Sequence, residues 1–309
     1  MNYKIYKMIF TQGVHFGAHS LEKSEITFQA DTLFSALCIE ALKIDKLETL
    51  LKSVKENHLV FSDAFPYMNQ EFFVPKPMKK IEQVTQSEDM TIRKKFKKLE
   101  YVQVSLLNQY LKGQYPIDKG SDIKELGVHT LKTSASIRGN EEALPYRVGI
   151  YRFKEHNGLY IVVGYDSEET LHLFDELFKM LSLSGIGGKK NSGLGHFKYN
   201  TVELPKELNK RLNTKGEVMT LSVSLPTDKE LEDVLDDSRY LLVKRSGFID
   251  SYTYSKEQRR KKDIYLFKSG SCFNKTYQGD IYNVSSDGSR PVYKYAKPLF
   301  MGVEVWRTI

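Results

Sequence analysis

The chain has very little cysteine. Only Cys38 and Cys272 occur among its 309 residues, far apart and each in an apolar context. Neither a disulfide framework nor a cysteine-based zinc site can be assembled from two such residues. We therefore expect a protein that folds in a reducing compartment, the cytoplasm.

Long apolar runs are also missing. No segment approaches the ~20 apolar residues that a membrane-spanning helix requires, and Met1-Asn2-Tyr3-Lys4 lacks the apolar core of a signal peptide. We expect no contact with a membrane. Tryptophan is single, whereas tyrosine (19) and phenylalanine (17) are numerous, so aromatic side chains are available for the core, for strands or as stacking platforms for bases.

Acidic residues are outnumbered, with 39 against 46 lysines and arginines and a formal net charge of +7. The surplus is concentrated in short runs at residues 93–98, at Lys189-Lys190 and at residues 256–262. Clustered cations favour a polyanionic partner over a small acidic metabolite. An ordinary solvated helix face or loop is the alternative for any single run.

A chain of this length exceeds the usual size of a single hydrophobic core, so we expect two domains. The first covers residues 1–204 and carries an insertion at about residues 75–145. A polar segment that starts with a proline, residues 205–216, is the predicted linker, and residues 217–309 form the second domain.

Hydrophobic periodicity predicts the elements of the first domain. Asp31 is expected to cap the first helix. The order strand, helix, strand, strand, helix, strand is the split βαβ plan of a ferredoxin-like domain, which is also the RRM arrangement. The expected elements are strand 3–10, helix 30–42, strand 59–61, strand 159–165, helix 170–183 and strand 197–204.

Two hairpins are predicted from turn signals. Residues 121–145 contain an alternating stretch that ends at Gly139-Asn140, which suggests a protruding hairpin. Strands 146–153 and 159–165 are separated by Asn157-Gly158, which predicts a second hairpin with a tight turn.

The second domain is less legible, because only one helix, residues 228–235, stands out. We interpret it as a degenerate copy of the same plan, so that the fold class is α+β with two tandem ferredoxin-like, RRM-like domains. Its expected strands are residues 218–225, 240–243, 264–267 and 281–284, with more strand at Tyr293 and in the tail 300–306.

Residues 185–196 concentrate five glycines and two lysines where a helix should become a strand. Glycine tolerates positive φ and lets backbone N–H groups form a concave nest that suits a phosphate. The adjacent Lys189 and Lys190 make an anion the expected ligand. The residues of this loop assigned to binding are Gly185, Gly187, Gly188, Lys189, Lys190, Asn191, Ser192, Gly193, Gly195 and His196.

This glycine-rich loop does not match the common nucleotide-binding motifs. Gly188-Lys189 is followed by Lys190 rather than by Ser or Thr, Leu183 stands where a Walker glycine should be, and no G-x-G-x-x-G occurs. Those motifs also run from strand to helix, the reverse of the order here. Binding of RNA backbone phosphates is the preferred interpretation, and a helix C-cap with a long glycine turn is the alternative.

The loop after the first strand, residues 11–25, carries His15, Phe16, Gly17 and His19, all four of which are candidate RNA contacts. Imidazole titrates near neutrality, so His15 or His19 could act as the general acid or base of a metal-free ribonuclease. No positioned partner is visible, and hydrogen bonding or stacking to RNA is the commoner role. His15 and His19 have the i, i+4 interval of some metal sites, but the glycines make this segment a loop and no carboxylate-rich cluster accompanies it, so no metal is expected.

Two further groups combine cations with residues suited to turns. Arg138 precedes the tip of the first predicted hairpin and could lie beside a base pair. After a predicted strand comes a combination that could clamp a phosphate and stack a base, or simply form an exposed turn: Lys244, Arg245, Ser246, Gly247 and Phe248.

Four features, in this order along the chain, resemble the RAMP superfamily. They are the first strand with its His-Phe-Gly loop, the helix start Ala-Asp-Thr-Leu-Phe-Ser-Ala-Leu, the glycine-rich loop between Leu-Ser and His-Phe, and the later Lys-Arg-Ser-Gly-Phe. More narrowly, the chain is similar to Csm subunit four of type III-A CRISPR effector complexes.

This resemblance implies a non-catalytic subunit without a cofactor, at the foot of a ribonucleoprotein. It would hold the repeat-derived 5′ handle of the CRISPR RNA, dock the large polymerase-cyclase-like subunit, adjoin a backbone RAMP subunit and contact target RNA only indirectly. Residues 185–196 and 15–19 correspond to the loops that contact the handle in the family. The inserted hairpin of related subunits acts as a thumb, which corresponds loosely to residues 121–145.

Three hypotheses therefore stand. The first is an RNA-binding scaffold, whose binding weakens with salt. The second is a metal-independent repeat endoribonuclease with a loop histidine as its acid-base group. The third is a basic protein-interaction module, which would show no salt-sensitive RNA binding.

Overall fold

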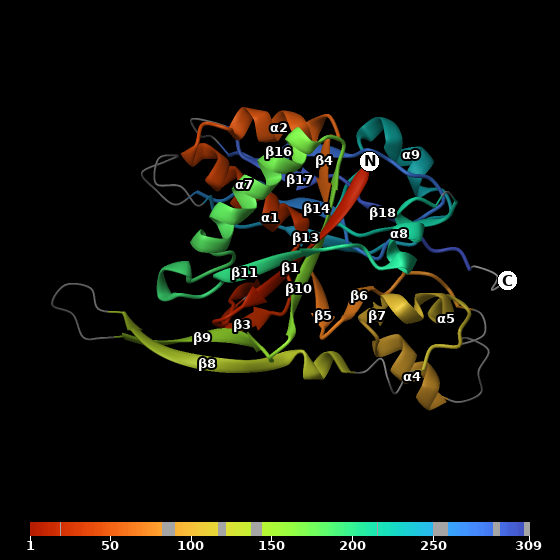
Figure 1. The fold of residues 1–309 in the computed structure, drawn as a ribbon, viewed down its shortest axis with the longest axis horizontal. Coiled ribbons are helices and arrows are strands. Elements are labelled where there is room, and N and C mark those ends of the chain that lie inside the picture. The colour runs from red at the N-terminus through yellow and green to blue at the C-terminus, as the bar shows by residue number, and fades with distance from the viewer. Residues whose placement is uncertain are drawn as a thin grey trace.

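A computed structural model shows β-sheets with helices packed on them (Figure 1). Among the described residues, no helix is long and apolar enough to cross a membrane. The structure describes residues 1–18, 20–81, 90–116, 122–136, 144–214, 216–249, 259–286 and 291–305.

The central sheet contains seven of the described strands. β1 (Asn2–Phe10) lies antiparallel between β10 (Asn157–Tyr165) and β11 (Phe197–Val202). Eight of the nine residues of β10 are buried, because this apolar strand is covered on both faces. The sheet continues from β10 through β5 (Phe65–Met68), β6 (Glu71–Pro75) and β7 (Tyr101–Gln103), and β4 (Leu59–Phe61) also pairs with β10.

Three helices pack together near this sheet: α1 (Ala30–Lys43), α2 (Leu47–Lys55) and α7 (Glu168–Ser184) (Figure 1). α7 begins where the Ser167 hydroxyl accepts a hydrogen bond from the Thr170 N–H, and it ends at Gly185 with φ 79°. A polar cap and a glycine in a positive-φ conformation are the usual helix boundaries. The observed helix thus leads directly into the glycine-rich loop.

The insertion supplies the strand at one end of the central sheet, β7, together with short helices. It comprises β7, the 3₁₀ turn η1 (Val104–Leu106), α4 (Met90–Lys98), α5 (Leu107–Leu111) and the 3₁₀ turn η2 (Asp122–Glu125). Phe96 of α4 stacks on Tyr110 of α5 with ring centroids 4.9 Å apart. Both rings are buried, so the basic run 93–98 is anchored by the one aromatic residue within it.

A hairpin lies in the region of the first prediction but with different bounds, and its predicted tip, Gly139-Asn140, lies outside the described residues. The second predicted hairpin is wrong. β8 (Gly127–Ser136) pairs with β9 (Leu144–Phe153) along their whole length, and the hairpin extends from the body (Figure 1). β9 and β10 do not pair with each other among the described strands, and Asn157-Gly158 are the first two residues of β10. Asn157 instead donates its side-chain amide to the Glu125 carbonyl at 2.9 Å, and a Cβ at Gly158 would overlap the Met8 carbonyl. Asn157 and Gly158 therefore serve these packing contacts and are not the central residues of a hairpin turn.

The C-terminal unit contains small antiparallel sheets rather than a single large one. Among the described strands, β12 (Val218–Thr220) lies between β15 (Cys272–Phe273) and β18 (Phe300–Gly302). β13 (Leu242–Arg245) pairs with β14 (Ile264–Phe267), and β16 (Asp280–Asn283) pairs with β17 (Tyr293–Ala296). α9 (Asp228–Leu235) occupies the predicted helix.

The predicted linker at residues 205–216 contains a packed helix, α8 (Lys206–Leu212). Leu208, Arg211 and Leu212 are buried in it. The sequence did not predict this helix, because charged residues alternate with these three and a buried arginine resembles a solvated one in sequence. Arg211 donates to the Gly302 and Glu304 carbonyls at 3.1 Å each and to Asn108 Oδ1 at 3.4 Å, which ties α8 to the C-terminal tail and the insertion.

The N-terminal and C-terminal parts share their hydrophobic cores. Tyr295 of β17 stacks on Phe61 of β4, with ring centroids 4.4 Å apart, and its hydroxyl accepts a hydrogen bond from the Phe61 N–H at 3.1 Å. The core that contains Phe34, Phe174 and Phe178 also includes Val223 and Leu266 of the C-terminal unit. Burial of each such side chain contributes about 1.5–3 kcal/mol, so the two parts stabilise one another.

Asp31 does not cap α1 as the sequence predicts. The N-cap residue is Gln29, which makes no side-chain cap bond, and Asp31 is fully buried. Arg245 donates to both oxygens of Asp31, at 2.8 and 2.9 Å, and Lys294 Nζ lies 2.6 Å from Oδ2. Burial by itself raises the pKa of Asp31, but Lys294 and Arg245 outweigh it and hold the pKa below its usual value.

A second buried carboxylate, Asp63, caps α1 from a distance. Its Oδ1 accepts hydrogen bonds from the Ala30 N–H at 2.8 Å and the Val223 N–H at 3.0 Å. Burial raises the pKa of Asp63 to about 6, although these N–H groups act in the opposite direction. Asp31 and Asp63 together fasten the start of α1 to the C-terminal unit.

We expect Asp31→Ala to lower the free energy of unfolding by about 3–5 kcal/mol, because it leaves Arg245 and Lys294 without their buried counter-charge. Since the pKa of Asp31 is depressed in the folded state, its stabilisation is present at neutral pH and is lost as the pH falls below about 4. Urea unfolding at several pH values measures both effects.

The matched control is Glu176→Ala, which removes a half-exposed partner of Lys46. It should change the free energy of unfolding by less than about 1 kcal/mol. Equal effects of the two substitutions would contradict a structural role for the Asp31 cluster.

Candidate nucleic-acid interface

The structure brings the two predicted binding loops together. The glycine-rich loop follows α7, and residues 11–15 follow β1, the neighbour of β11 in the sheet. The Gly188 N–H donates to the His15 carbonyl at 2.8 Å, and the Gly195 N–H donates to the Gly13 carbonyl at 3.1 Å. Two segments about 170 residues apart in sequence are therefore joined by backbone hydrogen bonds.

Most glycines of the loop are required for this packing. A Cβ at Gly195 would overlap the Ile186 carbonyl, and one at Gly188 would lie 2.8 Å from His15 Cδ2. Gly187 has φ 97° and faces the His15 carbonyl. Gly193 differs, because a Cβ there would meet nothing within 4 Å. The sequence argument linked all five glycines to a ligand, whereas four of them allow the loop to fold against its neighbours.

The outer part of the loop presents cations and backbone donors. Lys189 adopts a left-handed conformation with φ 59°, and the 3₁₀ turn η3 (Lys190–Ser192) follows it. Asn191 and Ser192 are exposed. Within the described residues, the N–H groups of Lys189, Lys190 and Asn191 have no hydrogen-bond acceptor in the chain. This outer part of the loop can therefore donate to an external anion.

Lys189 links the loop to the β8–β9 hairpin. Its ammonium lies 4.7 Å from the centroid of the Tyr146 ring and 3.5 Å from the Tyr146 hydroxyl. A cation over an aromatic face is held electrostatically. The loop and the outer half of the hairpin therefore form one continuous surface.

The predicted contacts of the first loop are mostly internal. His15 is only 6% exposed, and its Nδ1 lies 2.7 Å from the Gly149 carbonyl. A carbonyl only accepts, so Nδ1 carries the proton and donates. Phe16 is 4% exposed and packs edge-on against Phe28. Both side chains position the loop, and neither presents a face for stacking. His19 lies outside the described residues.

The stretch 244–248 is divided between internal and exposed roles. Lys244 pairs with Asp263 at 2.7 Å, and Arg245 is the partner of Asp31 described above. Ser246 is exposed, Phe248 is 56% exposed, and a Cβ at Gly247 would meet nothing within 4 Å. Among the described residues no hydrogen bond or ion pair joins this stretch to the glycine-rich loop. Arg138 lies outside the described residues.

A groove that the sequence did not indicate adjoins the two loops. It consists of two pockets, of about 880 and 470 Å³, that share Ser24, Glu25 and His129. Gly149, whose carbonyl binds His15, lines the smaller pocket. The groove therefore runs along β3 (Ser20–Glu25) and β8 from the loops towards α4.

The larger pocket combines lysines with aromatic and aliphatic residues. Burial raises the pKa of Tyr151 to about 12, so that phenol is neutral at physiological pH. His129 is exposed and meets the Tyr151 ring edge-on at 4.8 Å. These residues come from four separate segments, and only the basic run 93–98 gave a signal in sequence. The other lining residues include Lys95, Lys98, Lys124, Leu99, Tyr101 and Glu100.

Comparison with known proteins identifies close sequence relatives. A family model described as the CRISPR Csm4 C-terminal domain matches residues 213–303. A "CRISPR system Cms protein Csm4" of Mycobacterium tuberculosis is 39% identical over 98% of this chain and 98% of its own length. A protein of the same name from Streptococcus thermophilus is 37% identical over 99% of this chain and 100% of its own.

Solved structures share the fold at lower identity. A Csm3–Csm4 subcomplex of the type III-A CRISPR-Cas interference complex matches with a TM-score of 0.66 and 18% identity, over 96% of this chain and 98% of that chain. A Csm1–Csm4 cassette in complex with cA4 matches with a TM-score of 0.64 and 17% identity, over 99% and 100%. From its relatives at 37–39% identity along nearly its whole length, this chain belongs to the Csm4 family of RAMP subunits of CRISPR complexes.

Proposed function

We propose that this chain is the non-catalytic subunit of a type III-A CRISPR interference complex that holds the repeat-derived 5′ handle of the CRISPR RNA. Membership of the Csm4 family supports the assignment to such a complex. The observation that carries the RNA-binding role is the backbone joint between the glycine-rich loop and the loop after β1. It fixes the outer residues of the loop as one preformed surface.

The chemistry of this surface suits a phosphodiester backbone. Lys189 and Lys190 supply charge, and the N–H groups of residues 189–191 supply directional donors. Phosphate oxygens accept from both kinds of donor, and charged hydrogen bonds are the stronger ones. Binding of this type is independent of base sequence and falls with salt.

The groove along β3 and β8 is proposed as the path of the handle beyond the loop. Lysines 95, 98 and 124 line it for phosphates, and His129 offers an exposed aromatic ring for an unpaired base. Glu25 and Glu100 can accept from base amino groups. We assign the base contacts to this groove rather than to His15 and Phe16, because those two side chains are buried.

The β8–β9 hairpin is proposed as the thumb. Its two strands extend from the body (Figure 1). Tyr146, near the outer end of β9, contacts Lys189. From there the hairpin would approach the duplex of guide and target, and the chain would contact target RNA only indirectly. We assign residues 1–204 to a ferredoxin-like domain on the strand order β11-β1-β10-β4. Residues 217–309 are proposed as a degenerate second domain of the same kind.

The protein partners are proposed from the relatives. Csm4 proteins occur in solved complexes with Csm1 and with Csm3. We propose that this chain likewise adjoins a large polymerase-cyclase-like subunit and a backbone RAMP subunit, in the cytoplasm and without a cofactor.

Lys189→Ala combined with Lys190→Ala should weaken binding of handle RNA by about tenfold or more, and should reduce the slope of log affinity against log salt by about 1.4, because two cations near the RNA are lost. Filter binding over a salt series measures both. Lys206→Ala with Lys229→Ala is the control, since it removes the same charge from exposed positions on α8 and α9. An unchanged affinity and slope in the loop variant would refute the assignment of this loop.

The purified chain should leave repeat RNA intact in the presence of EDTA, because the His15 ring is buried and its Nδ1 already donates to Gly149. Gel analysis of the RNA over time is the measurement. A specific cut that leaves a 2′,3′-cyclic phosphate, and that disappears on His15→Ala or His19→Ala, would favour the endoribonuclease hypothesis instead.

A further inference from the structure

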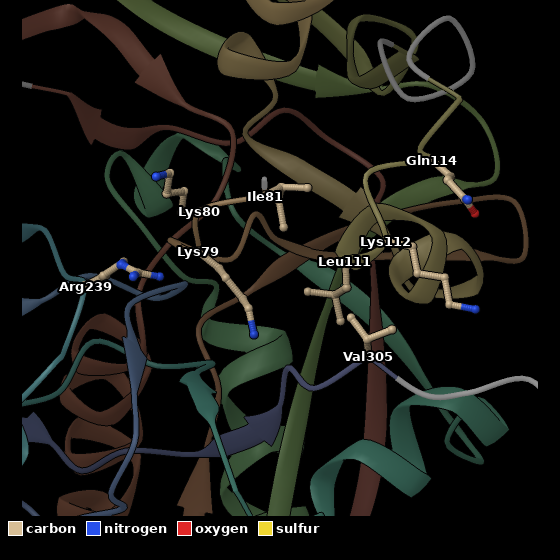
Figure 2. Close-up of a pocket in the computed structure, with 8 residues that line it drawn as sticks. All are labelled: Lys79, Lys80, Ile81, Leu111, Lys112, Gln114, Arg239 and Val305. Carbon is tan, nitrogen blue, oxygen red and sulfur yellow. The ribbon is translucent and has the colours of Figure 1, made fainter. Parts of the chain in front are cut away.

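A strongly basic pocket lies away from the proposed RNA surface. It has a volume of about 520 Å³, within the range of ligand-binding pockets. Figure 2 shows that its residues come from the insertion, from the C-terminal unit and from the C-terminal tail. They are Lys79, Lys80, Ile81, Leu111, Lys112, Gln114, Arg239 and Val305.

The charge in this pocket is of one sign. Four of its eight lining residues are cationic, and none is acidic. Lys79 is paired with Glu217, which lies beside the pocket. Lys80 and Arg239 are exposed, and neither side chain makes an ion pair with any part of the chain that the structure describes. In Figure 2 the Arg239 guanidinium points towards Lys79. Such an arrangement attracts an anionic ligand.

The pocket has a rigid frame. The Met78 N–H donates to the Gly270 carbonyl at 2.8 Å, which fixes the segment before Lys79 to the C-terminal unit. The fully buried Arg211 joins Asn108 of α5 to the Glu304 carbonyl, next to Val305. The walls therefore keep their positions without a ligand, which reduces the entropy lost on binding.

The lining of the pocket suits an acidic polypeptide better than it suits RNA. Its apolar residues are the aliphatic Ile81, Leu111 and Val305, with Leu111 and Val305 side by side in Figure 2. None of the eight lining residues is aromatic, so it offers no platform for an unpaired base. α5 and the tail also lie at the opposite end of the molecule from the loop between α7 and β11 (Figure 1). An acidic polypeptide with an aliphatic side chain fits this lining better than RNA.

We propose that this pocket is a docking site for an acidic segment of a partner protein, with carboxylates facing Lys80 and Arg239 and an aliphatic side chain against Leu111 and Val305. The site is separate from the proposed RNA surface and does not depend on it. Charge pairing at such a rim controls the rate and specificity of association and is weakened by salt.

The test uses the full chain and two labelled probes in fluorescence anisotropy: a short poly-L-glutamate peptide and a single-stranded RNA of similar charge. Lys80→Glu with Arg239→Glu should weaken peptide binding by at least about tenfold and leave RNA binding within twofold of wild type, about 0.4 kcal/mol. The matched control, Lys206→Glu with Lys229→Glu, changes the net charge equally and should leave peptide binding unchanged. Both control sites lie in the first turn of a helix, where a carboxylate is tolerated.

Val305→Asp gives a second, independent variant, because this half-exposed side chain can be changed without opening the core. It should reproduce the loss of peptide binding, with an unchanged thermal unfolding midpoint. Complexes assembled with the tagged pocket variants should then lack one protein subunit. Complexes assembled with the tagged control variant should lack none. Equal peptide binding by pocket and control variants would overturn the proposal. Loss of RNA binding without loss of peptide binding would also overturn it, and would make the pocket a nucleic-acid site.

Discussion

The arrangement of the molecule depends on one buried carboxylate. Asp31, in the first turn of α1, is neutralised by Arg245 and Lys294, which come from two different small sheets of the C-terminal unit. Removing these charges from water is unfavourable, so the cluster is tolerated only where all three groups meet in good geometry. The cluster therefore fixes where β13 and β17 sit against α1. Asp63 adds a second joint by bonding the start of α1 and the Val223 N–H at once. Shared hydrophobic cores around these joints hold the N-terminal and C-terminal parts together.

That rigid body supports a surface made by two loops. Backbone bonds from Gly188 to His15 and from Gly195 to Gly13 hold the glycine-rich loop against the loop after β1. The roles within the loop are divided: most of its glycines permit close packing, whereas Lys189 to Gly193 form its outer part. His15, the most suggestive catalytic candidate in the sequence, orients this joint through Gly149. Gly149 also lines the smaller pocket of the groove, so it connects the two loops to the groove. A preformed path of cations and neutral aromatic rings suits a single RNA strand.

Local patterns in the sequence predicted much of this fold. The α7 boundary, α9 and the position of the glycine-rich loop follow from caps, glycines and periodicity, all of which are short-range effects. The errors arose where tertiary contacts decide. Asn157-Gly158 has the composition of a tight turn, but its side-chain amide and its lack of a Cβ serve contacts with Glu125 and Met8. Arg245 and Arg211 look like surface cations, but each is bound by distant groups. The groove and the basic pocket combine residues from several segments, so no single stretch of sequence could indicate them.

The central claim is that the outer glycine-rich loop and the adjoining groove hold the handle RNA. Ultraviolet crosslinking of the assembled complex, with photoreactive nucleotides placed only in the handle and peptides identified by mass spectrometry, tests it most directly. The account predicts crosslinks within residues 189–193 and at Tyr146 or His129, and none on the helices α2 and α9. Handle crosslinks confined to residues 244–248, or to the pocket around Arg239, would contradict it.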